Sequence, residues 1–193
     1  LLGLTLKETN AARVNEQLAE MGVHEITGFH HEAQEMPDGK FLVLASSERL
    51  LRDVQGGGEV DVIGDTVLVL DRELKVFWAW DSFDHLDPGR MAVSGEVCTV
   101  GGGGCPPFYL AEKANDWLHS NSLQFAPDGN ILMSIRHMDS VVKIDYQDGV
   151  DFGEALDRRP RRRQADRRHA GRLRHSEEGP GGDLRDGRRH RGA

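Results

Sequence analysis

The sequence has little of several features that define whole classes of protein. It contains 2 cysteines among 193 residues, and aromatic residues make up 6% of it. No apolar run approaches the roughly 20 residues that a membrane-spanning helix needs, so we predict no membrane span. The opening residues, LLGLTLKETN, lack the charged start and the cleavage site of a signal peptide, and the chain does not begin with Met. The start of the chain therefore indicates no compartment.

Basic residues are scarce in the larger part of the chain. Residues 1–150 hold 11 Lys and Arg against 24 Asp and Glu, and nucleic acid repels such a surplus of negative charge. We therefore predict no nucleic-acid partner. Residues 151–193 differ, with 13 Arg, no Lys and 8 acidic residues. Almost no large apolar residues follow Leu156, so segment 150–193 cannot bury enough surface to offset its ordering entropy and is predicted to be disordered.

Three origins are consistent with this Arg-rich tail. Out-of-frame translation of GC-rich DNA yields the Arg, Gly, Ala, Pro, Asp and His residues that dominate it. The alternatives are a basic arm for nucleic acid or an acidic membrane surface, and a genuine unstructured linker. The composition changes abruptly after the DG turn that ends at Gly149, which favours the out-of-frame origin. Together with the missing Met, this predicts a chain that is incomplete at both ends.

The two cysteines, Cys98 and Cys105, flank a run of four glycines. A zinc site would need two more ligands at close spacing, and the surrounding sequence offers none. A loop-closing disulfide and two free thiols both remain open, because the compartment is not known. The His and Asp residues of the DHLDP segment around His85 are interpreted as loop residues. We therefore predict no metal site and no cofactor.

An internal repeat organises residues 23–149. The segment GFHHEAQEMPDGKFLVLASS has the pattern of a strand, a PDG turn and a strand, and LHSNSLQFAPDGNILMSI repeats it 90 residues later. A further strand also repeats, as DTVLVLD and DSVVKID. At this offset His31 aligns with Asn121. Residues 48–64, which hold a QGGGE loop, stretch the first copy, and a Gly- and Pro-rich insertion follows Trp80.

Four antiparallel strands in about 40 to 50 residues are typical of a β-propeller blade. The sequence therefore predicts an all-β fold, a partial β-propeller of about two to three blades. A closed propeller needs at least four blades. Residues 1–22 form a lead-in segment, in which Ala11, Val14, Leu18 and Met21 have helical spacing.

Four polar side chains gather on the strands that precede or follow the PDG turns. His119 and Asn121 are two residues apart and therefore are expected to share a strand face, while Arg136 ends the partner strand. His31 has the equivalent place in the first copy. Arg, His and Asn donors suit an oxyanion, and His can act as a nucleophile or as a general acid or base. Each residue alone could equally be structural, with Arg136 paired to a nearby Asp.

The segments that carry these residues resemble a known family. GFHHEAQEMPDGKFLVL, WAWDSFDHLD and above all NDWLHSNSLQFAPDGNILMSIRHMDSVVKID are similar to the bacterial arylsulfotransferases, which do not use the nucleotide sulfate donor. The resemblance runs from about His24 to Tyr146. It implies a six-bladed propeller, a periplasmic or secreted location, and sulfuryl transfer from a phenolic sulfate ester to a phenol through a histidine intermediate. The implied partners are therefore a small-molecule aryl sulfate and a phenol.

The resemblance also implies roles for individual residues. His119 and His31 match catalytic positions, and Asn121 and Arg136 match positions that bind the sulfuryl oxygens. The family's nucleophilic His lies in a later blade, where this chain has its Arg-rich tail, so the polypeptide is expected to lack it and to be inactive as it stands. The alternative is a non-catalytic β-propeller that serves as a binding module.

Overall fold

The computed structural model describes residues 8–146. The protein is mostly β, with 47% of residues in strands and 11% in helices, and its main sheet is curled like half a barrel. These features confirm the predicted fold class. The predicted disorder of segment 150–193 lies outside the described residues.

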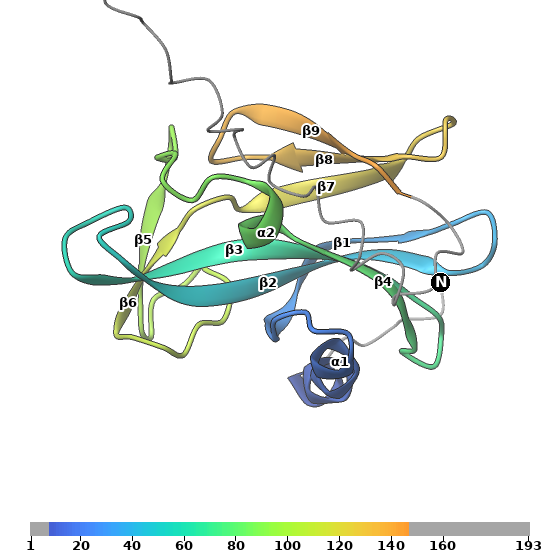
Figure 1. Ribbon diagram of the computed structural model, residues 1–193, viewed down its shortest axis with the longest axis horizontal. Helices are drawn as coiled ribbons and strands as arrows, with labels where there is room; N and C mark the ends of the chain where they lie inside the picture. The colour runs from blue at the N-terminus through green and yellow to red at the C-terminus, as the bar shows by residue number, and fades with distance from the viewer. Residues whose placement is uncertain (1–7, 147–193) are drawn as a thin grey trace, which may run out of the picture. The chain divides into compact units, whose positions relative to one another are not determined.

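Eleven elements make up the described part of the chain (Figure 1). In order they are α1 (Glu8–Glu20), β1 (Ile26–Glu35), β2 (Phe41–Arg52), β3 (Glu59–Leu70), β4 (Val76–Asp81), α2 (Ser82–His85), β5 (Glu96–Thr99), β6 (Lys113–Asp116), β7 (Ser120–Phe125), β8 (Ile131–Ile135) and β9 (Ser140–Ile144).

The internal repeat is visible as two antiparallel meanders. Strands β1 to β4 pair in chain order, and β7, β8 and β9 pair in the same way. The two PDG turns close identically, because the amides of Met36 and Ala126 donate at 2.8 Å to the carbonyls of Lys40 and Asn130. The described residues thus hold four strands of one blade-like unit and three of another. This arrangement is compatible with a propeller, and the number of blades stays a prediction.

The segment that stretches the first copy is strand rather than loop. Strands β2 and β3 stay paired through residues 48–64, with Glu48 opposite Ile63 and Leu51 opposite Val60. Only the short turn of residues 53–58 is unpaired with the opposite strand. The glycines of QGGGE lie in this turn, and the residues on either side of it belong to the hairpin.

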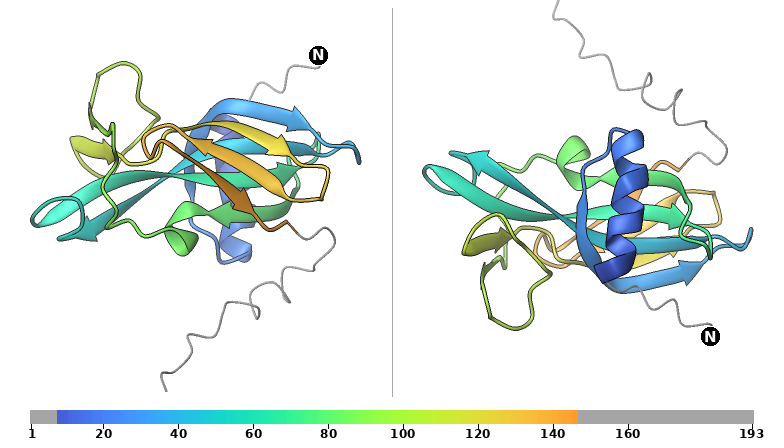
Figure 2. Two further views of the ribbon diagram at one scale, coloured as in Figure 1. Left: turned by 90° about the horizontal axis from the view of Figure 1, so that it is seen from above. Right: turned by 90° about the horizontal axis from the view of Figure 1, so that it is seen from below.

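The sheet of β1 to β4 is buried on both faces, and strand alternation decides which neighbour each residue contacts. Leu42 and Leu44 of β2 belong to a core shared with β7, β8 and β9. Val43 and Ala45, between and after them, belong to the core beneath α1. Figure 2 shows α1 lying across the sheet. A strand buried on both faces has a nearly continuous apolar run, as FLVLA does.

Helix α1 follows from the spacing of its apolar residues. Ala11, Val14 and Leu18 are buried against β2, β3 and β4, as their helical spacing predicts. The helix ends at Glu20, and Gly22, whose φ is 68°, has the left-handed conformation typical of a residue just after a helix. Within residues 8–146, neither helix has the length and apolar character to cross a bilayer.

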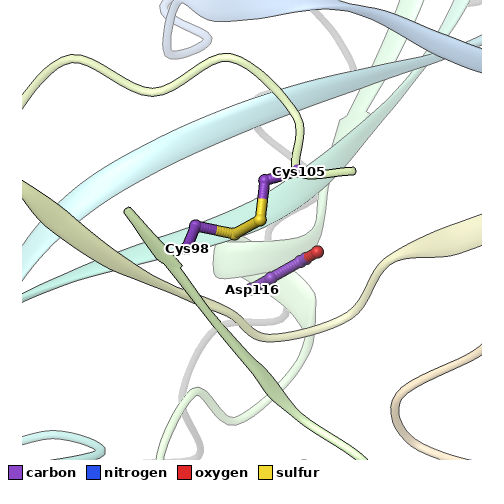
Figure 3. A group of neighbouring side chains, drawn as sticks. All are labelled: Cys98, Cys105 and Asp116. Atoms are coloured by element: carbon purple, nitrogen blue, oxygen red, sulfur yellow. A yellow bond between two sulfur atoms is a disulfide. The ribbon is translucent and has the colours of Figure 1, made fainter. Parts of the chain in front are cut away.

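The insertion between β4 and β7 carries the two cysteines. Strands β5 and β6 pair as an antiparallel hairpin, and β6 also joins β3 in parallel. A disulfide links Cys98 to Cys105, which resolves the alternative that the sequence left open (Figure 3). Glu48 of β2 fixes the following loop by accepting hydrogen bonds from the amides of Tyr109 and Leu110 at 2.8 and 3.3 Å.

Asp61 of β3 is a buried acid beside this loop. Its side chain is 2% exposed, and burial together with the neighbouring Glu48 raises its pKa to about 6. Because the folded pKa exceeds the ordinary value, the protonated form stabilises the fold, and this stabilisation is lost as the pH rises from about 4 to above 6. We expect Asp61→Asn to raise the free energy of unfolding at pH 7 by roughly 1 kcal/mol, since water partly screens the two acids, with little gain at pH 4.

Urea denaturation at the two pH values measures this difference. Asp145→Asn, at an exposed position, is the matched control and should change stability little at either pH. A gain in Asp61→Asn that is equal at pH 4 and pH 7 would contradict the proposed pKa.

Candidate functional site

His119 lies where β6 leads into β7. Its backbone has a φ of 47°, a conformation that costs a non-glycine residue about 1–2 kcal/mol and that clusters at functional sites. Hydrogen bonds hold the segment on both sides, from the Trp117 amide to the Ile63 carbonyl and from the His137 amide to the Leu118 carbonyl, both at 3.0 Å. The strained residue is therefore fixed by its neighbours.

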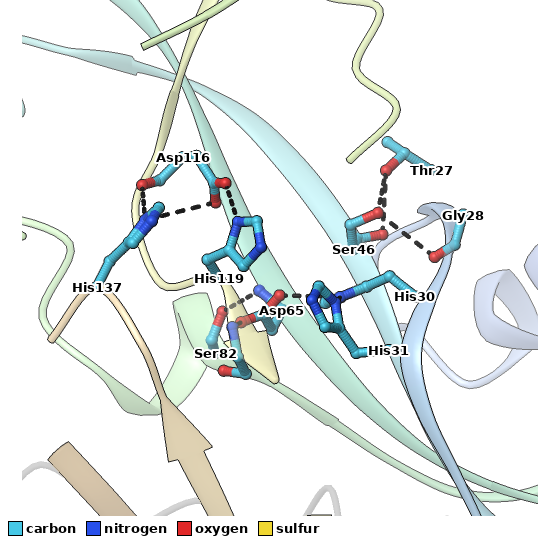
Figure 4. Close-up of polar contacts among 11 residues, drawn as sticks. Thr27, Gly28, His30, His31, Ser46, Asp65, Ser82, Asp116, His119 and His137 are labelled. Atoms are coloured by element: carbon cyan, nitrogen blue, oxygen red, sulfur yellow. Dashed lines mark hydrogen bonds and ion pairs between the residues drawn. The ribbon is translucent and has the colours of Figure 1, made fainter. Parts of the chain in front are cut away.

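The His119 ring is held from behind by a buried acid (Figure 4). Nδ1 of His119 forms a short hydrogen bond and ion pair with the carboxylate of Asp116, and both side chains are at most 4% exposed. Burial raises the pKa of Asp116, although His119 and His137 act in the opposite direction. Because Asp116 occupies Nδ1, Nε2 is the ring atom of His119 left for a substrate.

His137 completes this buried group. Its Nδ1 donates to the backbone carbonyl of Asp116 at 2.7 Å, and its ring lies 4.9 Å from that of His119. Asp116, His119 and His137 bring potential metal-ligand atoms within 4.8 Å of one another. Both Nδ1 atoms already bond to Asp116, so a hydrogen-bonded network explains the arrangement without an ion. The prediction of no metal site stays a prediction.

A second pair of histidines faces this group from β1. His31 has a φ of 51° and lies in the irregular stretch between Phe29 and Ala33, where β1 carries extra residues relative to β2. Its exposed ring is 5.0 Å from that of His119. The preceding residue, His30, turns inward, and its Nε2 forms an ion pair with Asp65 at 3.2 Å. Of the two, His31 is thus the one accessible from solvent.

Asp65 of β3 connects the two histidine-bearing strands. One carboxylate oxygen contacts His30, and the other accepts the amide of Ser120 at 2.8 Å, one residue after His119. The amide of Asp65 itself donates to Ser82 Oγ at 3.0 Å. Asp65 is 1% exposed, so a buried carboxyl group lies at the junction of the two blade-like units.

The charges of this cluster move the two neighbouring histidines in opposite directions. Burial lowers the pKa of His30, but the Asp65 carboxylate outweighs it and the net pKa is raised. The pKa of His31 is lowered, first by burial and then by His30, His119 and Arg136. Arg136 therefore acts electrostatically on His31, while its own side chain is exposed.

The predicted site residues are only partly brought together. His31 and His119 are in ring contact, and Arg136 is close enough to affect His31. Asn121 is exposed, whereas His119 is buried, and within residues 8–146 the Asn121 side chain makes no hydrogen bond. A register irregularity between Ser120 and Ser122, together with the left-handed backbone of His119, breaks the alternation that predicted a shared face.

Sequence reasoning did not identify four members of the cluster, which are His30, Asp65, Asp116 and His137. One signal was available for Asp65. An acid within the otherwise uncharged run VIGDTVLVL must be buried with the strand, and a buried carboxylate needs a donor or a cation.

The fold and the cluster define a β-rich protein with blade-like units and a group of histidine and arginine side chains where two units meet. Comparison with family models identifies the family. The model described as Arylsulfotransferase (ASST) matches residues 3–152, and the chain belongs to this family. A search of curated proteins found no match. Family membership confirms the resemblance and indicates sulfuryl transfer as the type of reaction.

Proposed function

We propose that this protein contributes to the transfer of a sulfuryl group from a phenolic sulfate ester to a phenol, through a histidine intermediate. The observation that carries the proposal is the ring contact of His31 on β1 with His119 just before β7, 5.0 Å between centroids. Arg136, just after β8, is near enough to lower the pKa of His31. A cationic guanidinium beside two imidazoles suits an anionic, tetrahedral group better than a neutral ligand.

In this proposal His119, Asn121 and Arg136 bind the sulfuryl oxygens. Negative charge moves on those oxygens and on the leaving phenolate as the S–O bond breaks, and donors fixed in advance stabilise it without reorganising. Asp116 fixes the His119 ring and leaves Nε2 for the substrate. The exposed side chain of Asn121 would bind the anion when it arrives.

We further propose that the nucleophilic histidine belongs to a later blade, outside the described residues 8–146. None of the described histidines combines an accessible ring with the place in a later blade that the family's nucleophile occupies. The disulfide between Cys98 and Cys105 supports an oxidising compartment, such as the periplasm or the exterior. Residues 8–146 would then bind aryl sulfates and would transfer the group only together with that later blade.

Two preparations test this function. The full chain and a version whose reading frame is restored after Gly149 are each incubated with p-nitrophenyl sulfate and a phenol acceptor, and released p-nitrophenolate is followed by absorbance. We expect ester binding by both and transfer by the second alone. An exposed histidine outside the cluster gives the control variant, His24→Ala, which should transfer normally.

Failure of the restored version to release p-nitrophenolate or to form a sulfated phenol would contradict the proposal. If it bound the ester without transferring the group, the result would favour the alternative of a non-catalytic binding module.

A further inference from the structure

Three side chains extend inward from the candidate site in a line. His31 is exposed, and its Nδ1 lies 3.0 Å from Nδ1 of His30. The side chain of His30 is 10% exposed, and its Nε2 lies 3.2 Å from the carboxylate of Asp65, which is 1% exposed. Figure 4 shows this line of contacts leading from the surface ring to the buried acid. A carboxylate behind a histidine commonly fixes its ring and stabilises the protonated form.

We propose that Asp65 and His30 form a buried proton store that supplies His31, so that His31 acts as the general acid and base toward the phenols. This inference rests on the proposed function and adds two residues to it that touch no substrate. His30 and Asp65 are positioning residues, because they act through His31.

The electrostatic surroundings support this direction of transfer. The charged and polar groups that face His30 are Asp65 on β3, the Ala45 carbonyl on β2, Asp116 on β6 and His31 on its own strand. Burial lowers the pKa of His30, but Asp65, the Ala45 carbonyl and Asp116 raise it, and the net pKa is raised. The groups that face His31 are His30, His119, Arg136 and Asp65. Burial and the first three lower the pKa of His31, and only Asp65 acts in the opposite direction. Between the two pKa values, His30 therefore carries the proton and His31 is neutral.

The proton is conserved over the two halves of the reaction. In the first half, the S–O bond of the donor ester breaks as an S–N bond forms to the nucleophilic histidine of the proposed function. The S–O electron pair stays on the phenolate oxygen, which takes a proton from Nε2 of His31. Nδ1 of His31 takes a proton from Nδ1 of His30, and neutral His30 remains against Asp65 through its Nε2–H. In the second half, the acceptor phenol oxygen bonds to sulfur, the S–N bond breaks with its electron pair left on the histidine nitrogen, and the phenol proton returns along the same path.

Ring-nitrogen NMR of the full chain tests the coupling without any substrate. The titrations of His30 and His31 are assigned among the 9 histidines by single substitution and compared in Asp65→Asn and His30→Gln. In Asp65→Asn we expect the pKa of His30 to fall by about one pH unit, because the carboxylate is gone. In His30→Gln, which keeps Asp65 and its bond to Ser120, the pKa of His31 should rise.

A matched substitution, His85→Gln at an exposed histidine, should leave both titrations unchanged. Unaltered titration of His31 in His30→Gln would overturn the proposal, and so would unaltered titration of His30 in a folded Asp65→Asn protein. Binding of p-nitrophenyl sulfate is measured on the same samples. Loss of ester binding with the coupling intact would contradict the proposed function, whereas ester binding with no coupling would contradict only the proton store.

Discussion

Trp117→Ala is expected to cost about 3–5 kcal/mol of unfolding free energy, the usual loss for a large buried aromatic side chain. Trp117 is 1% exposed within the core that both blade-like units share, and its ring lies 5.6 Å from that of Phe83. Its Nε1 donates to the Arg90 carbonyl at 2.9 Å, so truncation also leaves an acceptor unpaired. Because single domains have only about 5–15 kcal/mol in total, this variant should be largely unfolded in mild urea.

Circular dichroism during urea titration measures the loss. Trp78→Ala is the matched control, because Trp78 is only half-buried and packs against the same core from its margin, with its ring 5.2 Å from that of Tyr146. Its loss should be clearly smaller. If both variants lost the same unfolding free energy, Trp117 would contribute no more to the core than the half-buried Trp78 does.

Arg136→Ala is expected to lower the affinity for p-nitrophenyl sulfate by about 10- to 100-fold. A hydrogen bond between charged groups contributes about 1.5–3 kcal/mol, which corresponds to that range. Arg136 is exposed, so its removal should leave the fold intact. Arg136→Lys should lie between wild type and alanine, because it keeps the charge but loses the planar fork that binds two oxygens at once. Calorimetric titration with the ester measures all three affinities.

Arg72→Ala supplies the control, since Arg72 is exposed and pairs with Glu35 at 3.7 Å, away from the cluster. An affinity unchanged in Arg136→Ala would remove Arg136 from the proposed site. A second readout is independent of the ester. Arg136 lowers the pKa of His31, so Arg136→Ala should raise it.

The fold was predictable from sequence wherever its signals are local. Each PDG turn closes its hairpin with an equivalent backbone hydrogen bond. The 90-residue offset between the two turns is visible in the amino-acid sequence itself. The helical spacing of Ala11, Val14 and Leu18 likewise places α1 on the sheet. In each case the residues whose pattern predicts the element also make the turn or pack against the sheet. The prediction therefore needs no information about residues far away in the sequence.

The site was less predictable because its geometry depends on departures from regular structure. His31 and His119 both have positive φ, and each adjoins a stretch where the strand register shifts. A two-residue alternation cannot anticipate which side chain turns inward at such a point, and this is why Asn121 and His119 differ in burial. The contact between Asp65 and the Ser120 amide spans 55 residues and has no local signature.

The parallel pairing of β6 with β3 ties the segment that leads into the second blade-like unit to the sheet of the first. Residues 61–63 of β3 pair with residues 114–116 of β6, and His119 follows three residues after that ladder ends. A segment held only by side-chain packing can open separately, whereas opening of this one breaks backbone hydrogen bonds to β3. The strained backbone at His119 is thus anchored to the most deeply buried strand, and the cluster should persist as long as the whole fold does.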